Sequence, residues 1–573
     1  MVFLLAVFVL VIPLAVVGGL ILLVARLVSR RETNRTERLG TAIRRFFLYS
    51  IMLVTLVSSG VGLGGVIDAA VSTSSQIVQD SSAIARALAL VIVGVPVYIG
   101  LAVFTSRRLR IDPREQDSLG WVAYLTIALV GSLVATMSLA TAFVGTLLVD
   151  SHVEYGLLIH GTLWGAVWAG HWFAAGRREP GFGATAHLLL GSAAGLVASV
   201  VGITAFTVAA LETLYDSLTL TVVVGGGAES LLRPLIIVFI GIPVWWWYWL
   251  RHARNNERSV LWHTYVLLFG VLGGVILTIT GAGMLLYSIL RWVIGDPAAS
   301  SAVAHFASLP GAIGVAVTGG AVWVYHAHVL GQRSQRDRTE VDRVYDYLLA
   351  GAGLVVAASG VATLITVGLD TIVGGDITTA DNTIVASLTL LVVGGPLWWR
   401  YWNATGRARR DDPENELRSP TRRIYVFVLL GLAAIVAIIA LIVLLFLVFE
   451  DLLDGSLGRG TISSASATVG LLLTAGAVAW YHFAVFTEDR ADAPEDEGPV
   501  LREVILVGSV SQDLPDIISE QTGVPVHLLR CSAQPTTVES IDDLLTALNN
   551  GSSERVVVIS WDGERFETVA IED

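Results

Sequence analysis

Hydrophobic residues gather along this chain in about thirteen long runs, separated by short polar segments. A helix needs about 18 consecutive apolar residues to cross the hydrocarbon core of a membrane, which is roughly 30 Å thick. We therefore expect an all-α polytopic membrane protein of about thirteen transmembrane helices, followed by a small soluble α/β domain. The runs cover residues 2–27, 46–67, 86–105, 119–149, 156–175, 184–211, 231–250, 262–290, 303–330, 345–369, 384–402, 424–449 and 462–486.

A two-helix pattern recurs six times between residues 42 and 490, in two alternating kinds. The second helix of each odd pair carries a proline followed by aromatic residues. The second helix of each even pair carries a histidine shortly after an Ala-Val dipeptide. The prolines are Pro96, Pro243 and Pro396, and the histidines are His171, His326 and His482. Such a period indicates a four-helix unit that is copied three times along the chain.

This pattern also predicts the domain organisation. An amino-terminal helix with a basic loop covers residues 1–41, and the four-helix blocks cover 42–180, 181–338 and 339–490. An acidic linker at 491–499 leads to the α/β domain at 500–573. In that domain we expect strands at 502–510 and 524–529, helices at 514–521 and 538–548, and a hairpin of strands 555–560 and 567–571.

Composition and charge distribution agree with a membrane location. Hydrophobic residues make up 54% of the chain and charged residues 15%, whereas soluble domains contain about 25% charged residues. All 36 basic residues are arginines, and most of them flank every second connection between the runs. The positive-inside rule then places the amino terminus outside and the carboxyl-terminal domain in the cytoplasm of a cell (inner or plasma) membrane. The single cysteine, Cys531, excludes an intramolecular disulfide.

Two recurring segments suggest a family. Arg44–Tyr49, Asp342–Tyr347 and Arg422–Phe427 open three of the runs in a similar way, and a Gly-x-Pro-[Val/Leu]-aromatic motif begins at Gly94, Gly241 and Gly394. Over residues 42–490 the chain resembles an uncharacterised bacterial domain-of-unknown-function family of multi-pass membrane repeats. The resemblance implies a membrane architecture and carries no catalytic motif.

The three repeated histidines have two interpretations. If the blocks surrounded a pseudo-threefold axis, His171, His326 and His482 could converge on one metal or form a proton relay. We favour the other interpretation, in which each ring lies near a polar cytoplasmic flank among aromatic neighbours at the level of the lipid headgroups.

The aromatic residues and prolines of the repeats are further candidates. The aromatic side chains could stack a ligand or line an interface, and we favour the simpler interpretation that they anchor the helices at the membrane interface. The candidates are Tyr98, Trp168, Trp245, Trp246, Tyr248, Trp323, Trp398, Trp399, Tyr401 and Trp480. Pro96, Pro243 and Pro396 fall inside predicted helices, where equivalent kinks could act as hinges or serve packing alone.

Several functional classes lack support in the sequence. The predicted spans contain almost no Asp or Glu at mid-depth, which disfavours ion-coupled transport. We find no arrangement of nucleophile, acid, base and metal ligands. We therefore expect no catalytic residues and no cofactor, and no metal site apart from the alternative given for the three histidines. Acidic residues outnumber arginines over 500–573, which disfavours nucleic acid as a partner.

Two functional hypotheses remain. The first is a non-enzymatic membrane scaffold or sensory protein that contacts membrane lipids and, through residues 500–573, a cytoplasmic protein. The alternative is a transporter or channel with a substrate path between the membrane repeats. An intramembrane enzyme has the least support.

Overall fold

The computed structural model describes residues 39–71, 81–112, 115–116, 118–150, 153–176, 182–219, 228–255, 258–331, 338–374 and 377–492, and in the tail 504–507, 519, 525–531, 536–538, 556–559 and 566–572. The predicted first helix at 2–27 and most of the two predicted tail helices lie outside these residues. The chain forms two compact units, Met1–Ala491 and Asp492–Asp573.

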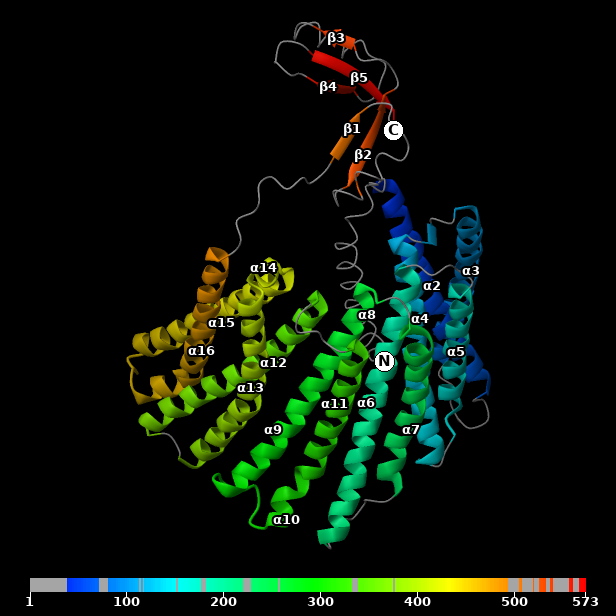
Figure 1. Ribbon diagram of the computed structural model, residues 1–573. Coiled ribbons are helices and arrows are strands. Elements are labelled where there is room, and N and C mark those ends of the chain that lie inside the picture. Colours follow the sequence, from blue (N-terminus) through cyan, green and yellow to red (C-terminus); the bar gives the residue numbers. More distant parts are fainter. Residues whose placement is uncertain are drawn as a thin grey trace. The chain divides into compact units, whose positions relative to one another are not determined.

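Unit 1 consists of helices that follow the predicted runs from 46–67 onward (Figure 1). Block 1 contains α2 (Leu39–Val71), α3 (Ser81–Ile111), α4 (Leu119–Leu148) and α5 (Tyr155–Ala175). Block 2 contains α6 (Phe182–Thr219), α7 (Ala228–Trp245), η3 (Trp246–Ala253), α8 (Val260–Thr264), η4 (Tyr265–Leu272), α9 (Gly273–Val293), α10 (Ala302–His305), η5 (Phe306–Ser308) and α11 (Leu309–Leu330). Block 3 contains α12 (Glu340–Ile372), α13 (Ile377–Asp411), α14 (Pro413–Arg418), α15 (Pro420–Leu453) and α16 (Arg459–Ala491).

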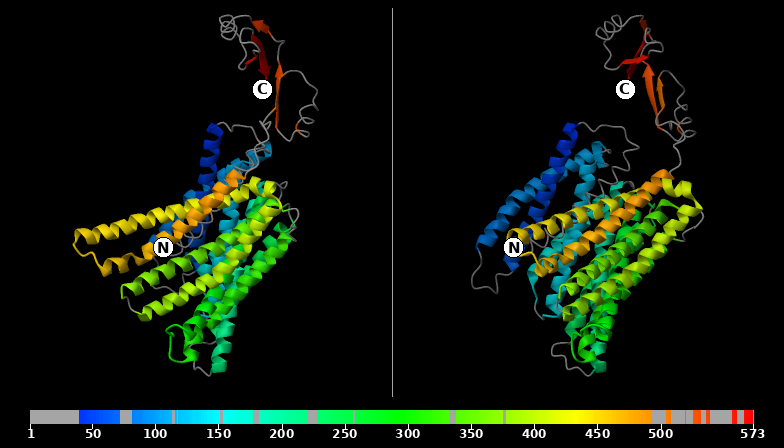
Figure 2. Two further views of the ribbon diagram at one scale, coloured as in Figure 1. Left: turned by 60° about the vertical axis from the view of Figure 1, so that its left-hand side comes forward. Right: turned by 90° about the vertical axis from the view of Figure 1, so that its left-hand side faces the viewer.

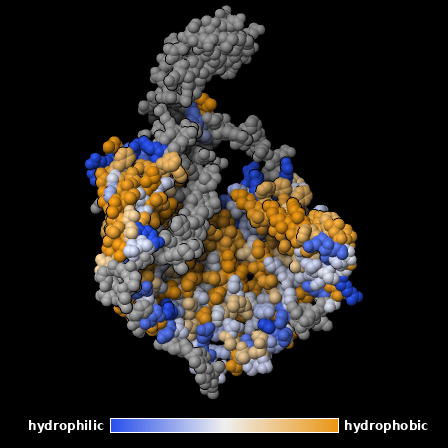
Figure 3. Space-filling view, turned by 180° about the vertical axis from the view of Figure 1, so that it is seen from behind, coloured by the Kyte–Doolittle hydropathy of each residue, from blue (hydrophilic) through white to orange (hydrophobic). Residues whose placement is uncertain are grey.

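Eleven of the described helical stretches are long and apolar enough to cross a membrane. The predicted run 156–175 also forms a long helix, α5, but it is not among the eleven. Its histidines, tryptophans and glycines lower its mean hydropathy. Figure 3 shows apolar residues over the middle of the described helices on one face, with hydrophilic residues mostly toward their ends.

Block 2 departs from simple α-helix in two places. The π-helix η3 directly follows α7, whose last turn contains Pro243, and the π-helix η4 lies between α8 and α9. A proline lacks the N–H of the regular ladder, and in a π segment each backbone hydrogen bond spans five residues instead of four. Trp249 of η3 and Tyr265 of η4 are both buried, with ring centroids 4.5 Å apart. The two π segments thus meet at the core of block 2.

Serines fix where the third helix of each block begins. Ser118, Ser259 and Ser419 each accept a hydrogen bond from the backbone N–H three residues later, which satisfies a donor left free at the helix start. The short helix α14 before Ser419 was not predicted from the sequence.

The same helix packing recurs in each block. The first helix packs on the second, the third on the fourth, and the first on the fourth. Between blocks, α4 contacts α6 and α7, while α9 contacts α13 and η4 contacts α12. The described helices of blocks 1 and 3 share no such interface. The blocks therefore follow one another in a row, and both views of Figure 2 show α15 and α16 beside α12 and α13.

The glycine of the Gly-x-Pro motif allows the helices of each odd pair to approach closely. A Cβ atom on Gly241 would lie 2.7 Å from the backbone nitrogen of Ser199, and one on Gly394 would lie 2.5 Å from that of Ala357. No larger residue fits at these crossings without moving a helix. This contact explains why the motif recurs.

Unit 2 contains a sheet of five described strands: β1 (Val504–Val507), β2 (Val526–Cys531), β3 (Thr536–Val538), β4 (Val556–Ile559) and β5 (Phe566–Glu572). β1 and β2 are parallel, and β5 pairs antiparallel with β2, β3 and β4. The predicted β4–β5 hairpin and the first two strands agree with this sheet. Strand β3 was not predicted; it reaches Val538, where the sequence predicted the start of a helix.

Candidate functional site

The repeated histidines make the same backbone contact in all three blocks. Nδ1 of His171, His326 and His482 lies 2.8 Å from the carbonyl oxygen of the valine four residues earlier. A carbonyl oxygen only accepts hydrogen bonds, so Nδ1 is the donor. In the neutral ring, Nε2 is then the acceptor.

A tyrosine on the third helix faces each histidine. The ring centroids of Tyr124 and His171 are 5.7 Å apart, those of Tyr265 and His326 are 5.8 Å apart, and those of Tyr425 and His482 are 6.1 Å apart. We call each histidine, its facing tyrosine and the aromatic residues packed on them a Tyr–His cluster. Each cluster joins the third and fourth helices of its block.

The polar atoms of the three clusters are satisfied to different degrees. In block 1 the hydroxyl of Tyr124 lies 2.9 Å from Nε2 of His171 and 3.3 Å from the hydroxyl of Tyr98. In block 2 the hydroxyl of Tyr265 accepts a 3.0 Å hydrogen bond from the indole of Trp245, while Nε2 of His326 is buried without a partner.

In block 3 the corresponding atoms are all buried without a hydrogen-bond partner. They are the Tyr425 hydroxyl, His482 Nε2 and the indole nitrogen of Trp398, which stands two residues after its proline as Trp245 does. Buried polar atoms in native proteins are nearly always paired. The block 3 cluster therefore has unused hydrogen-bonding capacity.

A tryptophan also packs on the cluster in blocks 2 and 3. The indole of Trp249 donates to the hydroxyl of Tyr325 at 2.9 Å, and that of Trp402 donates to Tyr481 at 2.6 Å. Block 1 has Ala102 at this position, six residues after the proline. This difference leaves the block 1 cluster smaller than the other two.

The other predicted aromatic residues make contacts between blocks, pack within a block or have exposed rings. The Trp168 indole donates to Tyr248 at 2.6 Å, and the Trp323 indole donates to Tyr345 at 3.0 Å. These bonds join α5 to η3 and α11 to α12. Tyr401 packs on Tyr345, with ring centroids 6.0 Å apart. Trp246, Trp399 and Trp480 are 49%, 63% and 75% exposed.

The structure does not bring the three histidines together. Within the described residues, no group of three or more His, Cys, Asp or Glu side chains could hold a metal ion. Each histidine contacts its own block, and His326 and His482 are fully buried among aromatic rings. Their depth at the level of the lipid headgroups stays a prediction. The prolines Pro96, Pro243 and Pro396 lie inside helices on their exposed faces, and their role as hinges stays a prediction.

A buried carboxylate lies at one end of block 1, in the connection between α3 and α4. Glu115, 1% exposed, accepts hydrogen bonds of 3.0 and 2.9 Å from the guanidinium of Arg45 and one of 3.1 Å from Tyr49. Burial opposes the charge on Glu115, but the hydrogen bonds and positive charge of Arg45 outweigh it. The pKa of Glu115 is therefore held below its usual value.

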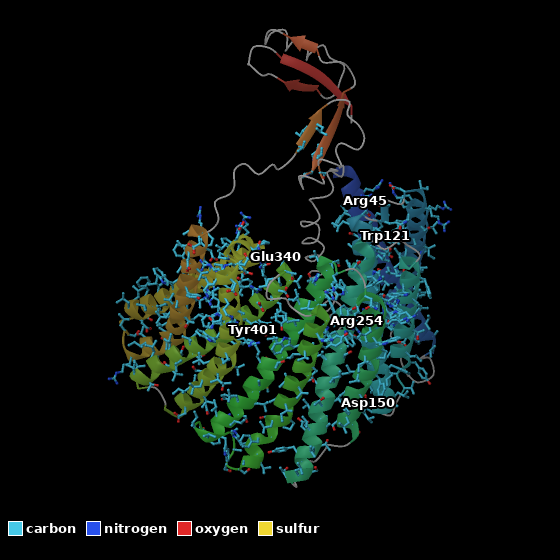
Figure 4. The ribbon with its side chains drawn as sticks, viewed as in Figure 1. Arg45, Trp121, Asp150, Arg254, Glu340 and Tyr401 are labelled. Atoms are coloured by element: carbon cyan, nitrogen blue, oxygen red, sulfur yellow. The ribbon has the colours of Figure 1, made fainter. Side chains whose placement is uncertain are left out.

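Block 3 repeats this arrangement with two arginines on one carboxylate oxygen. Glu416, 1% exposed, accepts hydrogen bonds of 2.9 Å each from Arg343 and Arg338. Arg343 also pairs with Glu340 at 2.7 Å. In block 2 the residue three positions before the capping serine is Asn256, so a carboxylate is missing at the equivalent position. Figure 4 labels Arg45 and Glu340 near the same end of unit 1 and Asp150 toward the other.

An arginine connects the third helix of block 3 to the end of α16. Arg422 is 3% exposed and donates two hydrogen bonds, of 2.7 and 2.9 Å, to the carboxylate of Asp489. A third nitrogen of Arg422 donates to the hydroxyl of Tyr347 at 3.0 Å. Arg409 of α13 adds an ion pair of 2.8 Å with Glu488. The last turns of α16, which lead into the tail, are therefore held by α13 and α15.

A large apolar cavity lies between α9, α12, α13 and α15. Its volume is about 1060 Å³, and no charged or histidine side chain lines it. Its apolar wall includes Ile276, Met284, Leu348, Leu390 and Val428. Its lining also includes the polar side chains of Tyr347, Thr421 and Tyr425. The cavity therefore adjoins both the Tyr–His cluster and the Arg422 contact.

Sequence reasoning missed Glu115, Glu416 and the role of Arg422. The sequence contains a signal for the two carboxylates. Each stands three residues before a helix-capping serine, and the first helix of its block carries an arginine near its start. The Arg422–Asp489 pair joins residues 67 positions apart, and no local pattern predicts it.

These observations define the class of this protein. It is a helical repeat protein whose helices are long and apolar enough to cross a membrane. The family model of a domain of unknown function (DUF5671) matches residues 45–159, 185–321 and 343–477, more than half of the chain. The chain belongs to this family. No curated protein matches it, and no solved structure matches it.

Proposed function

We propose that this chain is an integral membrane protein with a sensory or scaffolding role, in which the membrane part is coupled to the cytoplasmic tail. The observation that carries the proposal is the double contact of Arg422. One side of its guanidinium holds Tyr347, which lines the cavity, and the other holds Asp489 near the end of α16. A change in the cavity can therefore shift the helix from which the tail begins.

The proposed orientation places the arginine-rich helix connections and the tail in the cytoplasm, and the amino terminus outside. The acidic tail would then be free to contact a cytoplasmic protein. The distribution of the 36 arginines supports this orientation. Fluorescence of green fluorescent protein fused to the carboxyl terminus tests it, since that protein folds on the cytoplasmic side. Loss of fluorescence despite full expression would reverse the orientation.

Hydrogen–deuterium exchange tests the coupling. Gly351 lines the cavity, and a Cβ atom there would lie 3.5 Å from Tyr425, so Gly351→Leu fills the cavity without meeting backbone. We expect this variant to change amide exchange over residues 485–491. The control is Gly431→Leu on α15, where a Cβ atom meets nothing within 4 Å and which does not line the cavity.

The role of Arg422 is tested in the same experiment. In an Arg422→Gln background, Gly351→Leu should no longer change exchange at the end of α16. If the exchange response persists without Arg422, the coupling does not pass through this side chain. If Gly351→Leu never alters exchange, the sensory proposal fails.

A transporter is the second candidate, because the cavity lies at an interface between two repeats. Its uncharged lining favours an apolar solute over an ion. Flux of hydrophobic solutes into proteoliposomes, blocked by Gly351→Leu and retained by Gly431→Leu, would support it. Absence of flux across a broad panel would exclude this alternative.

A further inference from the structure

The interface between blocks 2 and 3 shows how one block holds the next. Leu267 and Val271 of η4 form one buried apolar cluster with Tyr345 and Leu349 of α12. Block 1 uses its third helix in the same way, because α4 contacts α6 and α7 of block 2. The third helix of one block therefore packs on the opening helices of the following block.

Block 3 leaves the corresponding face of its third helix uncovered. Phe427 stands two residues after Tyr425, as Leu267 stands two residues after Tyr265. Leu267 is buried, whereas Phe427 is 64% exposed. Ile438, three turns further along the same face, is exposed as well. Only 6% of the residues in an 18-residue apolar stretch of α15 are buried, against 39% in α4.

Block 1 leaves the complementary face uncovered. Phe47 and Ile51 of α2 occupy the positions of Tyr345 and Leu349 in α12, counted from the arginine of each buried ion pair. Tyr345 and Leu349 are buried by block 2, whereas Phe47 is 57% exposed and Ile51 is exposed too. The two ends of the row thus present the two halves of an interface that the chain already forms internally.

A second copy in the same membrane can present its half in the correct orientation. Each block contains four long helical stretches, an even number, so the three blocks run through the membrane in the same direction. The α2 helix of another copy can therefore approach α15 as α12 approaches η4. Within lipid, close packing of side chains holds such helices together.

We propose that α15 of one chain docks on α2 of a second copy, so that the chains associate head to tail. In this contact Phe427 packs on Phe47 and Ile51. Such an interface joins two different surfaces and continues the row of blocks from one chain to the next. The inference goes beyond the proposed function and takes from it only the membrane location.

The contact between copies lacks one hydrogen bond of the internal interface. The Trp323 indole donates to Tyr345 at 3.0 Å between blocks 2 and 3. Block 1 has Phe47 at the tyrosine position, and block 3 has Ala479 at the tryptophan position, counted from the repeated histidine. We therefore expect association between copies to be weaker than the contact between blocks.

Cysteine cross-linking of the full chain in membranes tests the proposal. The only native cysteine is first removed as Cys531→Ser. Phe47→Cys and Phe427→Cys are then placed in separate chains with different tags, co-expressed and treated with a short bismaleimide. We expect a cross-linked product that carries both tags. Val324→Cys in place of Phe427→Cys is the control, because Val324 is exposed on α11 outside both faces, and it should give no such product.

Energy transfer between chains with different fluorescent proteins at the carboxyl terminus, diluted with lipid in vesicles, measures the strength of association. Phe427→Ala should weaken it about fivefold. Phe446→Ala is the matched control, since Phe446 is an exposed phenylalanine at the other end of α15, about a quarter turn away, and it should have no effect. Phe47→Tyr with Ala479→Trp should restore the missing bond and strengthen association about three- to tenfold.

Three results would overturn the proposal. Cross-linking of Phe427→Cys chains with one another, but not with Phe47→Cys chains, would mean that α15 pairs with itself. Cross-linking only within a chain that carries both cysteines would mean that the row closes on itself. The absence of any cross-link would mean that lipid covers both faces. None of these results changes the exchange response at the end of α16, so the sensory proposal stands or falls separately.

Discussion

The guanidinium of Arg45 and the carboxylate of Glu115 face each other through two hydrogen bonds of 3.0 and 2.9 Å, and they join the first helix of block 1 to the connection before the third. Glu115 is almost completely buried and Arg45 partly so. Removing one partner of such a pair is costly, because the other charge stays buried without a counter-charge.

Glu115→Gln should therefore lower the free energy of unfolding by about 2–4 kcal/mol. The expected loss is somewhat smaller than for a fully buried pair, because the Arg45 side chain is partly exposed to solvent. Thermal unfolding in detergent measures the change. Glu414→Gln is the control, because Glu414 is 62% exposed in its pair with Arg418 and should change stability by less than about 0.5 kcal/mol. Equal effects at both positions would show that burial of the pair is unimportant.

The same carboxylate predicts a pH dependence. The pKa of Glu115 is lower in the folded chain than its usual value, so the folded state favours the ionised form. Its contribution to stability is then fully present above the usual pKa, about 4.5, and is lost as the pH falls through the lower folded pKa. Between pH 6 and acidic pH, the unmodified chain should lose more stability than Glu115→Gln. Parallel curves for the two proteins would contradict this assignment.

Two tyrosines at the same position of different blocks should respond differently to removal of the hydroxyl. Tyr124→Phe deletes a buried hydroxyl that contacts His171 and Tyr98, and it should cost about 1–3 kcal/mol. Tyr425→Phe deletes a hydroxyl without a partner and should leave the stability of the chain unchanged or slightly higher. Melting temperatures of the two variants make the comparison, and a large loss in Tyr425→Phe would show that this hydroxyl has a partner.

Adjacent glycines in α13 should give effects of opposite sign. A Cβ atom on Gly394 would meet the backbone of Ala357 and Gly353, so Gly394→Ala should destabilise the chain by about 1–3 kcal/mol. A Cβ atom on Gly395 meets nothing within 4 Å, so Gly395→Ala should stabilise the helix by about 0.5–1 kcal/mol. Chemical unfolding of both variants makes the comparison. Losses of equal size would mean that helix approach does not select glycine at 394.

The Arg422–Asp489 pair should show energetic coupling. Arg422→Gln and Asp489→Asn each remove the same two hydrogen bonds, so the double variant should lose less stability than the two single losses together. We expect a coupling energy of about 1–3 kcal/mol from the four unfolding free energies. Strict additivity would show that the end of α16 is held by other contacts, such as Arg409 with Glu488.

The sequence by itself determined the repeat, the positions of the long helices and the aromatic and histidine positions of each block. These features are local or periodic, because a long apolar run and a capping serine act within one helix. The sequence also indicated the β4–β5 hairpin of the tail, since alternating strands on both sides of a short turn form a local pattern.

Only the tertiary structure decided how the blocks are arranged and what the repeated residues contact. It placed the three histidines in separate clusters along a row, although identical spacing is equally compatible with a shared site. It paired Glu115 with Arg45 and Asp489 with Arg422 across large separations in sequence, and it left Tyr425 unpaired beside a cavity. Such contacts depend on how whole helices cross, and a crossing depends on side chains of both helices at once.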